Sequence, residues 1–328
     1  MSRSANDSAG PLVAVRDLAV SFRSGGGEVL ALDEVGLEIG AGERVGLVGE
    51  SGSGKSTLAL AVAGFVKGNG RRSAGRAQVA GQDVFEGDAE TLRRLRATKF
   101  GFVFQNPIGT LDPTRKIERQ FFDAEGRAIA PARITALLEG VGLADTQRVL
   151  ASYPHELSGG MAQRVAIAMA IEHEPAILVA DEPTSALDAS IRIQILELLL
   201  ATSLRLHSAL LLVSHDLPAI RRYCERVVVM YAGRIVEQGR TEAIFQHPLH
   251  PYTAALIAAM PGREGFGGKI DAIPGHPPVV HERAASCTFA PRCPRANDEC
   301  RGRRPALVEL DGSGGRRVAC LRVTEEAR

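Results

Sequence analysis

Residues 49–57 read GESGSGKST and fit the pattern G-x-x-x-x-G-K-S/T of a phosphate-binding loop. The stretch before it, Val45 to Val48, is apolar and typical of a buried strand, and the Ala- and Leu-rich segment from Lys55 to about Val66 predicts a helix. Such a loop requires this position between a strand and a helix. An exposed Lys in an ordinary glycine-rich turn is the alternative, and it leaves that position unexplained. The sequence therefore predicts an α/β fold with a site for nucleotide phosphates.

The residue types in this loop explain how it would hold phosphate. Glycines let successive backbone N–H groups curl around anionic oxygens, and the start of a helix adds about half a positive charge. Lys55 would bridge the terminal phosphates, and the Ser56 hydroxyl would ligate Mg²⁺. We expect the nucleotide to contact Gly49, Ser51, Gly52, Ser53, Gly54, Lys55, Ser56 and Thr57.

The rest of the chain alternates strand-like and helix-like segments. Residues 12–22 and 29–39 alternate apolar and polar side chains around a glycine-rich turn and predict a hairpin, and a further strand is expected near residues 77–80. The pattern is helical over about residues 114–173 and amphipathic over 190–206, and short apolar strands are expected at 100–104, 176–180, 210–213 and 226–231. This alternation predicts a mostly parallel sheet covered by helices on both faces.

Two acidic residues follow one of these strands. The segment AILVADEP, residues 176–183, places Asp181 and Glu182 where a buried apolar strand ends. Asp181 can hold the water shell of Mg²⁺, and Glu182 can polarise an attacking water. Acidic residues before Pro also favour the start of a helix, because the helix dipole attracts them. Because the same chain also has a phosphate-binding loop, we favour the interpretation in which Asp181 anchors the metal and Glu182 is the catalytic base.

Composition excludes several classes of protein. The chain has 39 Lys and Arg against 38 Asp and Glu, a net charge of +1 and 45% hydrophobic residues, which argues for a globular protein and against one that coats nucleic acid. No apolar stretch approaches the roughly 18 to 20 residues that span a bilayer. The first residues, MSRSANDSAG, lack the apolar core of a signal peptide. We expect a flexible leader at residues 1–11 and a cytosolic chain.

The segment LSGGMAQR, residues 157–164, opens an apolar helix and distinguishes families of phosphate-loop ATPases. Six motifs follow one another in this chain, namely Gly49 to Thr57, Gln105, Leu157 to Arg164, Asp181-Glu182, Ser185 to Asp188 and His215. Their order over residues 12–245 resembles the ATP-binding cassette (ABC) ATPases. The resemblance implies an ABC-type P-loop ATPase core, in which a mostly parallel sheet is joined by an antiparallel β subdomain and by a helical subdomain at about residues 106–173.

The resemblance also implies roles for residues that would be ordinary polar or aromatic side chains if viewed alone. Phe22 sits where an aromatic ring stacks on adenine; Tyr is more frequent there, but Phe keeps the π face. Gln105 matches the residue that senses the γ-phosphate and Mg²⁺ and couples to membrane subunits. His215 matches the γ-phosphate contact that supports the transition state. The implied catalytic residues are Glu182, His215, Lys55 and Gln105, and the implied Mg²⁺ ligands are Ser56, Gln105 and Asp181.

A second ATPase subunit is implied as well. Ser158, Gly159 and Gly160 match the signature that closes over the nucleotide bound by a partner, and Asp188 matches the loop that communicates across the dimer. The chain has one phosphate-binding loop and one signature, so it needs an identical or homologous partner to complete an ATP site. ATP and Mg²⁺ are the cofactors that this resemblance implies.

Several further segments resemble the ATP-binding subunits of dipeptide, oligopeptide and nickel importers. They are YPHELSGGM (153–161), FQNP with LDP (104–113), VVVMYAGRIVEQG (227–239), HPLHPYT (247–253) and CTFAPRCP (287–294). This resemblance implies a peripheral protein on the cytoplasmic face of the cell (inner) membrane. Its partners would be two integral-membrane permeases and an extracytoplasmic solute-binding protein, with no nucleic acid. In the HPLHPYT segment, a structural turn into a helix is favoured over metal ligation by its His residues.

The cargo is left open by the sequence. Short peptides are favoured, and nickel or another small solute is the alternative, because permeases and the binding protein select the cargo. A soluble ABC ATPase that acts on DNA or the ribosome is a further alternative. It would need a long coiled coil or two cassettes, and residues 58–156 are too short and too often interrupted by Gly and Pro for the former.

Four of the five cysteines lie in a tail, residues 246–328, that reads as a small accessory domain after the ATPase domain at 12–245. Their spacing is C-x5-C-x6-C-x19-C, with Pro294 after the second, and it lacks the C-x-x-C pairs of zinc ribbons. Four thiolates suit a 4Fe–4S cluster or zinc, and the irregular spacing with a Cys-Pro step favours iron–sulfur. Unligated thiols are the third possibility. The residues concerned are Cys287, Cys293, Cys300 and Cys320.

Overall fold

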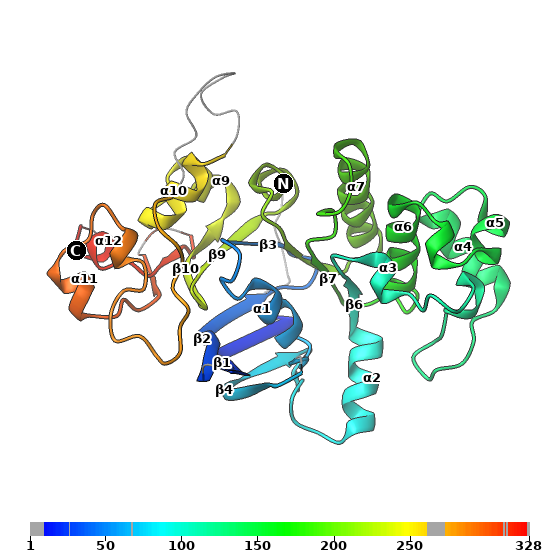
Figure 1. Cartoon of the computed structure of the whole chain (residues 1–328), viewed down its shortest axis with the longest axis horizontal. Coiled ribbons are helices and arrows are strands. Elements are labelled where there is room, and N and C mark those ends of the chain that lie inside the picture. The colour runs from blue at the N-terminus through cyan, green and yellow to red at the C-terminus, as the bar shows by residue number, and fades with distance from the viewer. Residues whose placement is uncertain are drawn as a thin grey trace. The chain divides into compact units, whose positions relative to one another are not determined.

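The computed structural model (Figure 1) describes residues 10–25, 27–66, 68–260, 273–310, 312 and 314–326. Apart from residues 10 and 11, the predicted leader lies outside this part of the chain. The described residues divide into two compact units: one lies within Met1–Ala14, Glu38–Glu43 and Ala77–Leu211, and the other lies within Val15–Leu37, Arg44–Arg76 and Leu212–Arg328. None of the helices in the described ranges has both the length and the hydrophobicity needed to span a bilayer.

The second unit contains most of the antiparallel β subdomain. Strands β2 (Gly27–Ile39), β1 (Val13–Ser24) and β4 (Gly70–Val79) are neighbours in this order, and β5 (Gln82–Asp83) follows β4. The predicted hairpin of β1 and β2 is therefore present, whereas β4 begins seven residues earlier than the strand expected at 77–80. Fully buried Leu18, Leu32 and Leu37 supply its core.

A second group of strands in this unit carries the phosphate-binding loop. Strand β3 (Arg44–Val48) pairs in parallel with β9 (Arg226–Tyr231), β9 pairs antiparallel with β10 (Arg234–Arg240), and β10 pairs antiparallel with β12 (Arg317–Val318). Strand β11 (Val308–Glu309) adds to β12. Every residue of β3 after Arg44 is buried, and helix α8 (Leu217–Tyr223) contacts this strand. The remaining helices are α1 (Lys55–Ala61), α9 (Thr241–Gln246), α10 (Pro251–Ala258), α11 (Asp298–Gly302) and α12 (Leu321–Glu326).

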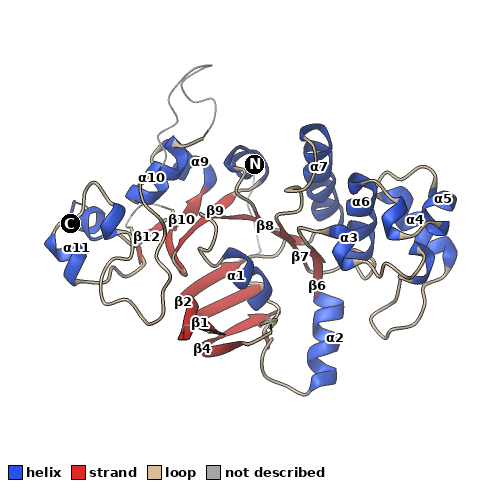
Figure 2. Cartoon of the chain, viewed as in Figure 1, coloured by secondary structure: helices blue, strands red, loops and turns tan. Residues whose placement is uncertain are grey.

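The first unit joins parallel strands to a group of helices (Figure 2). Strand β6 (Phe100–Val103) pairs in parallel with β7 (Ile177–Asp181), and β8 (Ala209–Val213) begins beside the residue that precedes β7, since the Ala209 N–H donates to the Ala176 carbonyl at 2.9 Å. Helix α6 (Gly159–Ala170) contacts β6 and the neighbouring helices. The other helices are α2 (Ala89–Lys99), α3 (Pro107–Thr110), α4 (Pro131–Gly140), α5 (Thr146–Ala151) and α7 (Ala189–Leu206).

The structure has the α/β class that the sequence predicts, and some of its elements differ from the predicted ones. Strands expected at 100–104, 176–180, 210–213 and 226–231 are present within one residue at each end. Helix α1 ends at Ala61 and not near Val66, because Gly64 turns into the left-handed region (φ +72°) and its N–H bonds back to the Ala61 carbonyl. The domain limits near residues 11 and 245 stay predictions.

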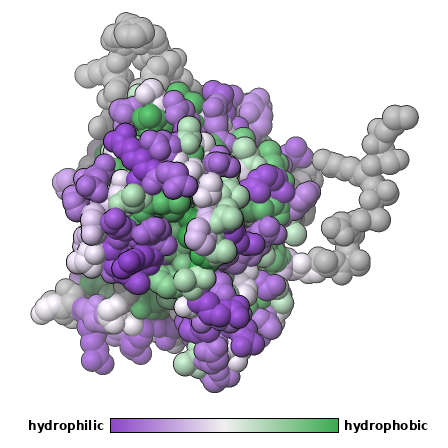
Figure 3. Space-filling view, turned by 90° about the vertical axis from the view of Figure 1, so that its right-hand side faces the viewer, coloured by the Kyte–Doolittle hydropathy of each residue, from purple (hydrophilic) through white to green (hydrophobic). Residues whose placement is uncertain are grey.

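Figure 3 shows a face on which hydrophobic residues lie between hydrophilic ones. Among the described residues of the first unit, the large apolar side chains with substantial exposure are Ile108, Phe122, Ile193 and Leu204. Single exposed apolar residues are ordinary on a protein surface, so exposure alone does not identify these side chains as a binding surface.

Candidate functional site

The loop of residues 49–57 runs from β3 to α1, and its glycines are required by geometry. Gly49, Gly52 and Gly54 adopt φ values of +152°, +78° and +98°, which L side chains rarely adopt. A Cβ on Gly49 would lie 2.3 Å from the Met230 carbonyl oxygen, and one on Gly54 would lie 2.5 Å from the Ala31 carbonyl oxygen. The backbone therefore forms a cradle that only glycine can build.

Two polar groups in the cradle suit an anionic ligand. Lys55 is 6% exposed, and its Nζ donates to the carbonyls of Gly49 and Glu50 at 2.9 Å each. The Ser53 hydroxyl is buried and has no hydrogen-bond partner among the described residues. Gly54 is the N-cap of α1 and offers no side chain to the first amides of the helix. These features fit the phosphate groups of a nucleotide.

Two other predicted residues lie in the same unit as the loop. The ring of Phe22 lies against Gly70, where a Cβ would come within 2.5 Å of Phe22 Cε1. His215 is exposed and follows β8. The preceding Ser214 donates its N–H to the Leu47 carbonyl at 3.2 Å, two residues before the loop begins. The backbone thus places His215 beside the strand that leads into the loop.

In the first unit, Asp181 ends β7 and Glu182 follows it with a φ of +46°. A left-handed conformation in a residue other than glycine is strained, and such strain is frequent at functional sites. The carbonyl of Glu182 accepts from the N–H and the hydroxyl of Ser185 at 3.3 and 3.2 Å. Gln105 lies two residues after β6 and is exposed. These residues are where the sequence placed them, at the carboxyl ends of strands.

The signature residues form the start of α6. Ser158 is the N-cap, and its hydroxyl accepts from the Met161 N–H at 3.3 Å. A Cβ on Gly160 would lie 2.9 Å from Ile191 Cγ2, and one on Gly159 would lie 3.2 Å from Leu187 Cδ2, so both glycines permit close packing.

Asp188 in the same unit caps α7. Its carboxylate accepts from the N–H groups of Ile191 and Ser190 at 3.0 and 3.1 Å and from the Ser190 hydroxyl at 2.8 Å. These hydrogen bonds, that of the Ile191 N–H above all, lower the pKa of Asp188. The roles of Asp188 and the signature residues across a dimer remain predictions.

The four tail cysteines converge, but they do not form a ligand set. Their thiols lie close enough to influence one another electrostatically, and the Cys287 N–H donates to the Cys300 carbonyl at 3.0 Å. Burial raises the pKa of Cys287, Cys293 and Cys320, whereas metals bind thiolates. Within the ranges that the structure describes, no three His, Cys, Asp or Glu side chains are arranged to hold a metal ion. The predicted cluster therefore finds no support in this arrangement.

One contact of the phosphate-binding loop could not be predicted from the sequence. Glu50, the second residue of the loop, is bound by Arg292 and Tyr252, which belong to the tail. Arg292 lies inside the CTFAPRCP segment and Tyr252 inside HPLHPYT, so the signal was present, but nothing in the spacing relates either residue to Glu50.

Two family models match the chain. The model described as "ABC transporter" matches residues 32–185, and that described as "Oligopeptide/dipeptide transporter, C-terminal region" matches residues 236–300. Among solved structures, a dimeric post-hydrolysis state of the ATP-binding cassette MJ0796 bound to ADP and Pi is similar to this chain, with a TM-score of 0.62 and 28% sequence identity. The match covers 70% of this chain and 98% of the MJ0796 chain. The cbiO1 protein from Clostridium perfringens, part of the ABC transporter complex cbiONQ, has a TM-score of 0.61 and 27% identity, with coverages of 73% and 92%.

Curated relatives match over nearly the whole length. The oligopeptide transport ATP-binding protein OppD of Escherichia coli (strain K12) is 37% identical over 98% of this chain and 96% of its own length. A putative peptide import ATP-binding protein of Brucella abortus (strain 2308) is 40% identical over 96% and 97%, and the dipeptide transport ATP-binding protein DppD of Escherichia coli is 39% identical over 94% and 96%. With these matches, the chain belongs to the ABC transporter ATPases, in the branch that carries the oligopeptide/dipeptide transporter C-terminal region.

Proposed function

We propose that this chain is the ATP-hydrolysing subunit of a membrane importer of di- or oligopeptides. The observation that carries the proposal is the similarity over the full length, including residues 236–300, to proteins named for oligopeptide and dipeptide transport. The solved cassettes cover only 70% to 73% of the chain, so the similarity to peptide-transport proteins extends beyond what those cassettes share with it.

As a member of the ABC ATPases, the chain hydrolyses ATP with Mg²⁺. In our proposal the loop amides, Lys55 and the Ser53 hydroxyl hold the phosphates. Ser56, Gln105 and Asp181 would hold Mg²⁺, which would supply positive charge against the phosphates. Glu182 orients and polarises the attacking water, and His215 contacts the γ-phosphate. Phosphoryl transfer to water needs only positioning and charge stabilisation, and these residue types supply both.

A second ATPase subunit completes each site in this proposal. The chain has one phosphate-binding loop and one signature. Ser158, Gly159 and Gly160 lie at the start of α6, whose backbone N–H groups would contact a phosphate bound by the partner. Asp188 lies at the start of α7, whose Ile191 packs against Gly160. The partner is either a second copy or a homologous chain.

The membrane partners in this proposal are two permeases, which receive solute from an extracytoplasmic binding protein, and the chain works on the cytoplasmic face of the inner membrane. Ile108 and Phe122, 40% and 42% exposed, follow Gln105 in the helical part of the first unit. Gln105 is the residue that we assign to coupling with the membrane subunits. Exposed apolar side chains that follow it closely in the sequence suit a contact with a permease.

Mass spectrometry of what co-purifies with the tagged chain, in mild detergent from its native membranes, tests this proposal. Two integral permeases, a homologous ATPase and a solute-binding protein would support an importer, and that binding protein could then be tested for peptides and for nickel. Selective binding of nickel would overturn the peptide assignment. Recovery with DNA-repair or ribosomal proteins would overturn the transport function while leaving the ATPase intact.

The four tail cysteines carry a separate proposal, a 4Fe–4S cluster with zinc as the alternative. The presence of four cysteines in the tail, with an irregular spacing and a Cys-Pro step, supports it. Because the described arrangement holds no ligand set, loading would require the thiols to reorient and to lose their protons. Metal analysis and visible absorption of anaerobically purified protein test this idea, and protein free of iron and zinc would rule it out.

A further inference from the structure

The second residue of the phosphate-binding loop is bound by an arginine of the tail. Arg292 Nη1 lies 2.7 Å from Glu50 Oε2, and Arg292 Nη2 lies 2.9 Å from Glu50 Oε1. The two residues are 242 positions apart in the sequence. The Arg292 side chain is only 5% exposed and that of Glu50 is 24% exposed. A two-pronged ion pair of this kind is stronger and more directional than an ordinary surface pair.

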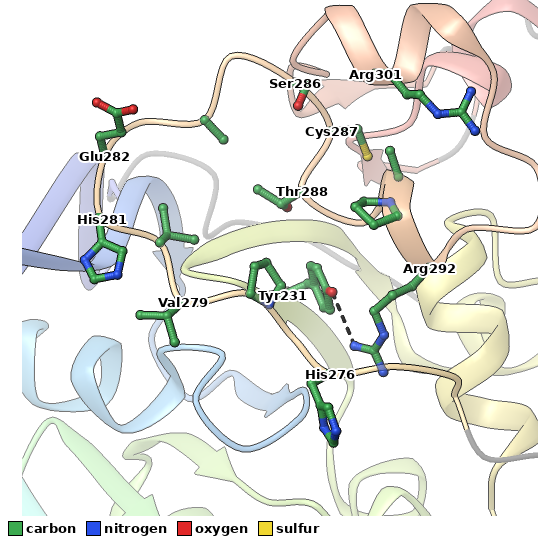
Figure 4. A pocket seen from close by; sticks show the side chains of 15 residues that line it. Tyr231, His276, Val279, His281, Glu282, Ser286, Cys287, Thr288, Arg292 and Arg301 are labelled. Atoms are coloured by element: carbon green, nitrogen blue, oxygen red, sulfur yellow. Dashed lines mark hydrogen bonds between the residues drawn. The ribbon is translucent and has the colours of Figure 1, made fainter.

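The remaining donors of Arg292 are also engaged. Its Nε donates to the Pro274 carbonyl at 2.7 Å, Nη1 to the Tyr231 hydroxyl at 3.2 Å and Nη2 to the Ile273 carbonyl at 3.3 Å. Arg292 and Tyr231 line one side of a cavity of about 690 Å³, where Figure 4 shows their hydrogen bond. Only a planar guanidinium can make all these contacts together, so lysine would not replace it.

Glu50 is also held through its backbone. Its N–H donates to the Tyr252 hydroxyl at 2.8 Å, and its carbonyl accepts from Lys55 Nζ at 2.9 Å. The ring centroids of Tyr252 and Tyr231 are 4.7 Å apart, and Phe289, three residues before Arg292, packs on both. Contacts thus run from the tail through Glu50 to the lysine that we assign to the phosphates.

Charge gives this arrangement a consequence for ligand binding. A carboxylate in a loop that receives a polyphosphate would repel it, and the effect is large because the site is partly shielded from water. Arg292 cancels that charge at hydrogen-bonding distance, and the hydrogen bonds to Glu50 raise the pKa of Arg292, so the guanidinium keeps its charge.

We propose that Arg292 is a positioning residue for nucleotide binding, which fixes and neutralises Glu50 so that the loop has full affinity for ATP only while the tail is in place. The inference rests on the proposed role of residues 49–57 in binding ATP. Arg292 directly precedes Cys293. A change in backbone conformation at this cysteine would therefore displace Arg292 from Glu50.

Calorimetric titration of the purified full-length chain with Mg·ATP tests the proposal. We expect R292A to weaken ATP binding about tenfold and R292K to behave similarly. Removing the carboxylate should remove the need for the arginine. E50Q should therefore cost at most about threefold, and R292A added to E50Q should cost less than about twofold more. R301A is the control, since Arg301 lines the same cavity but pairs with exposed Asp298.

Two results would overturn the inference. One is unchanged affinity in R292A. The other is an equal loss from R292A in the wild-type and E50Q backgrounds, which would indicate general damage to the tail. K55A separates this inference from the proposed function. If K55A binds ATP as the wild type does, the loop is not the ATP site. If K55A loses ATP binding while R292A keeps it, the loop is the ATP site and Arg292 has no role in it.

Discussion

Glu182 illustrates how a single residue connects conformation and chemistry. It follows the buried strand β7 in a left-handed conformation, which aims its side chain differently from a continuing strand. Replacing it with Gln keeps its size but removes the base. We expect E182Q to bind ATP as the wild type does and to hydrolyse it at least about 100-fold more slowly in the assembled complex. Normal turnover by that complex would show that another group is the base.

His250 gives a prediction about pH. It is 2% exposed, its Nδ1 accepts from the Tyr252 N–H at 3.1 Å as the N-cap of α10, and burial lowers its pKa to about 3. The unfolded chain binds a proton below its usual pKa of about 6.5, while the folded chain stays neutral. The free energy of unfolding should therefore fall between pH 6.5 and about 3, with a slope of up to about 1.4 kcal/mol per pH unit from this residue.

H250N isolates this contribution, because Asn can still cap the helix but cannot be protonated. Unfolding midpoints measured from pH 7 to pH 4 should fall less steeply for H250N than for the wild type. Equal slopes would mean that the imidazole is protonated in the folded protein. The same buried, capping position explains why the HPLHPYT segment forms a turn into a helix, as its Pro-rich sequence predicted.

Among the secondary-structure elements, β6 and α6 depend on a glycine that sequence patterns did not reveal. A Cβ on Gly101 would lie 2.3 Å from the Ala170 carbonyl oxygen and 2.7 Å from Leu178 Cδ2. We expect G101A to destabilise the protein by about 1 to 3 kcal/mol, because backbone must move. The control is G140A in α4, where nothing lies within 4 Å of the added methyl, and it should be neutral or slightly stabilising. Denaturant unfolding compares the two.

Sequence patterns predicted the long elements better than the short ones. Strands such as β9 and β7 are continuous apolar runs, and α7 is a long amphipathic helix, so periodicity is sufficient to identify them. Strands β11 and β12 have two residues each; β12 pairs with β10, and β11 pairs with β12, a tertiary effect that a local pattern does not contain. The early end of α1 depends on the conformation of Gly64.

At the scale of the whole molecule, the tail is joined to the ATPase strands by a buried ion pair. Glu237 of β10 is fully buried and accepts from Arg316 Nε at 3.2 Å and from the N–H groups of Leu249 and His250 at 3.0 Å each. We expect E237A to lower the free energy of unfolding by about 3 to 5 kcal/mol, because it leaves a buried arginine and two amides without their acceptor.

A neighbouring pair provides the control for this prediction. Glu309 and Arg317 form an ion pair in which both side chains are about half exposed, so E309A should change the free energy of unfolding by less than about 1 kcal/mol. Chemical unfolding of both variants makes the comparison. Similar small effects would show that the buried pair does not hold the tail in place.

The site could be predicted from the sequence to the extent that its residues are local. The loop, the acids after β7 and the signature are each contiguous, and their residue types carry the chemistry. The link from Arg292 to Glu50 could not be predicted, because it arises only when residues 242 positions apart meet. The cysteines show the converse: their spacing predicted a ligand set, and folding brings the thiols near one another without arranging them as one.

The pairing of β12 with β10 also bears on how the protein is made. Residues 317 and 318 are synthesised well after β10, yet they cover the edge of that strand. Until then β10 presents unpaired backbone groups, a template for adding strands from other chains. Completion of this edge therefore waits for the synthesis of β12, and nascent chains that stall before residue 317 should be the ones that aggregate or need a chaperone.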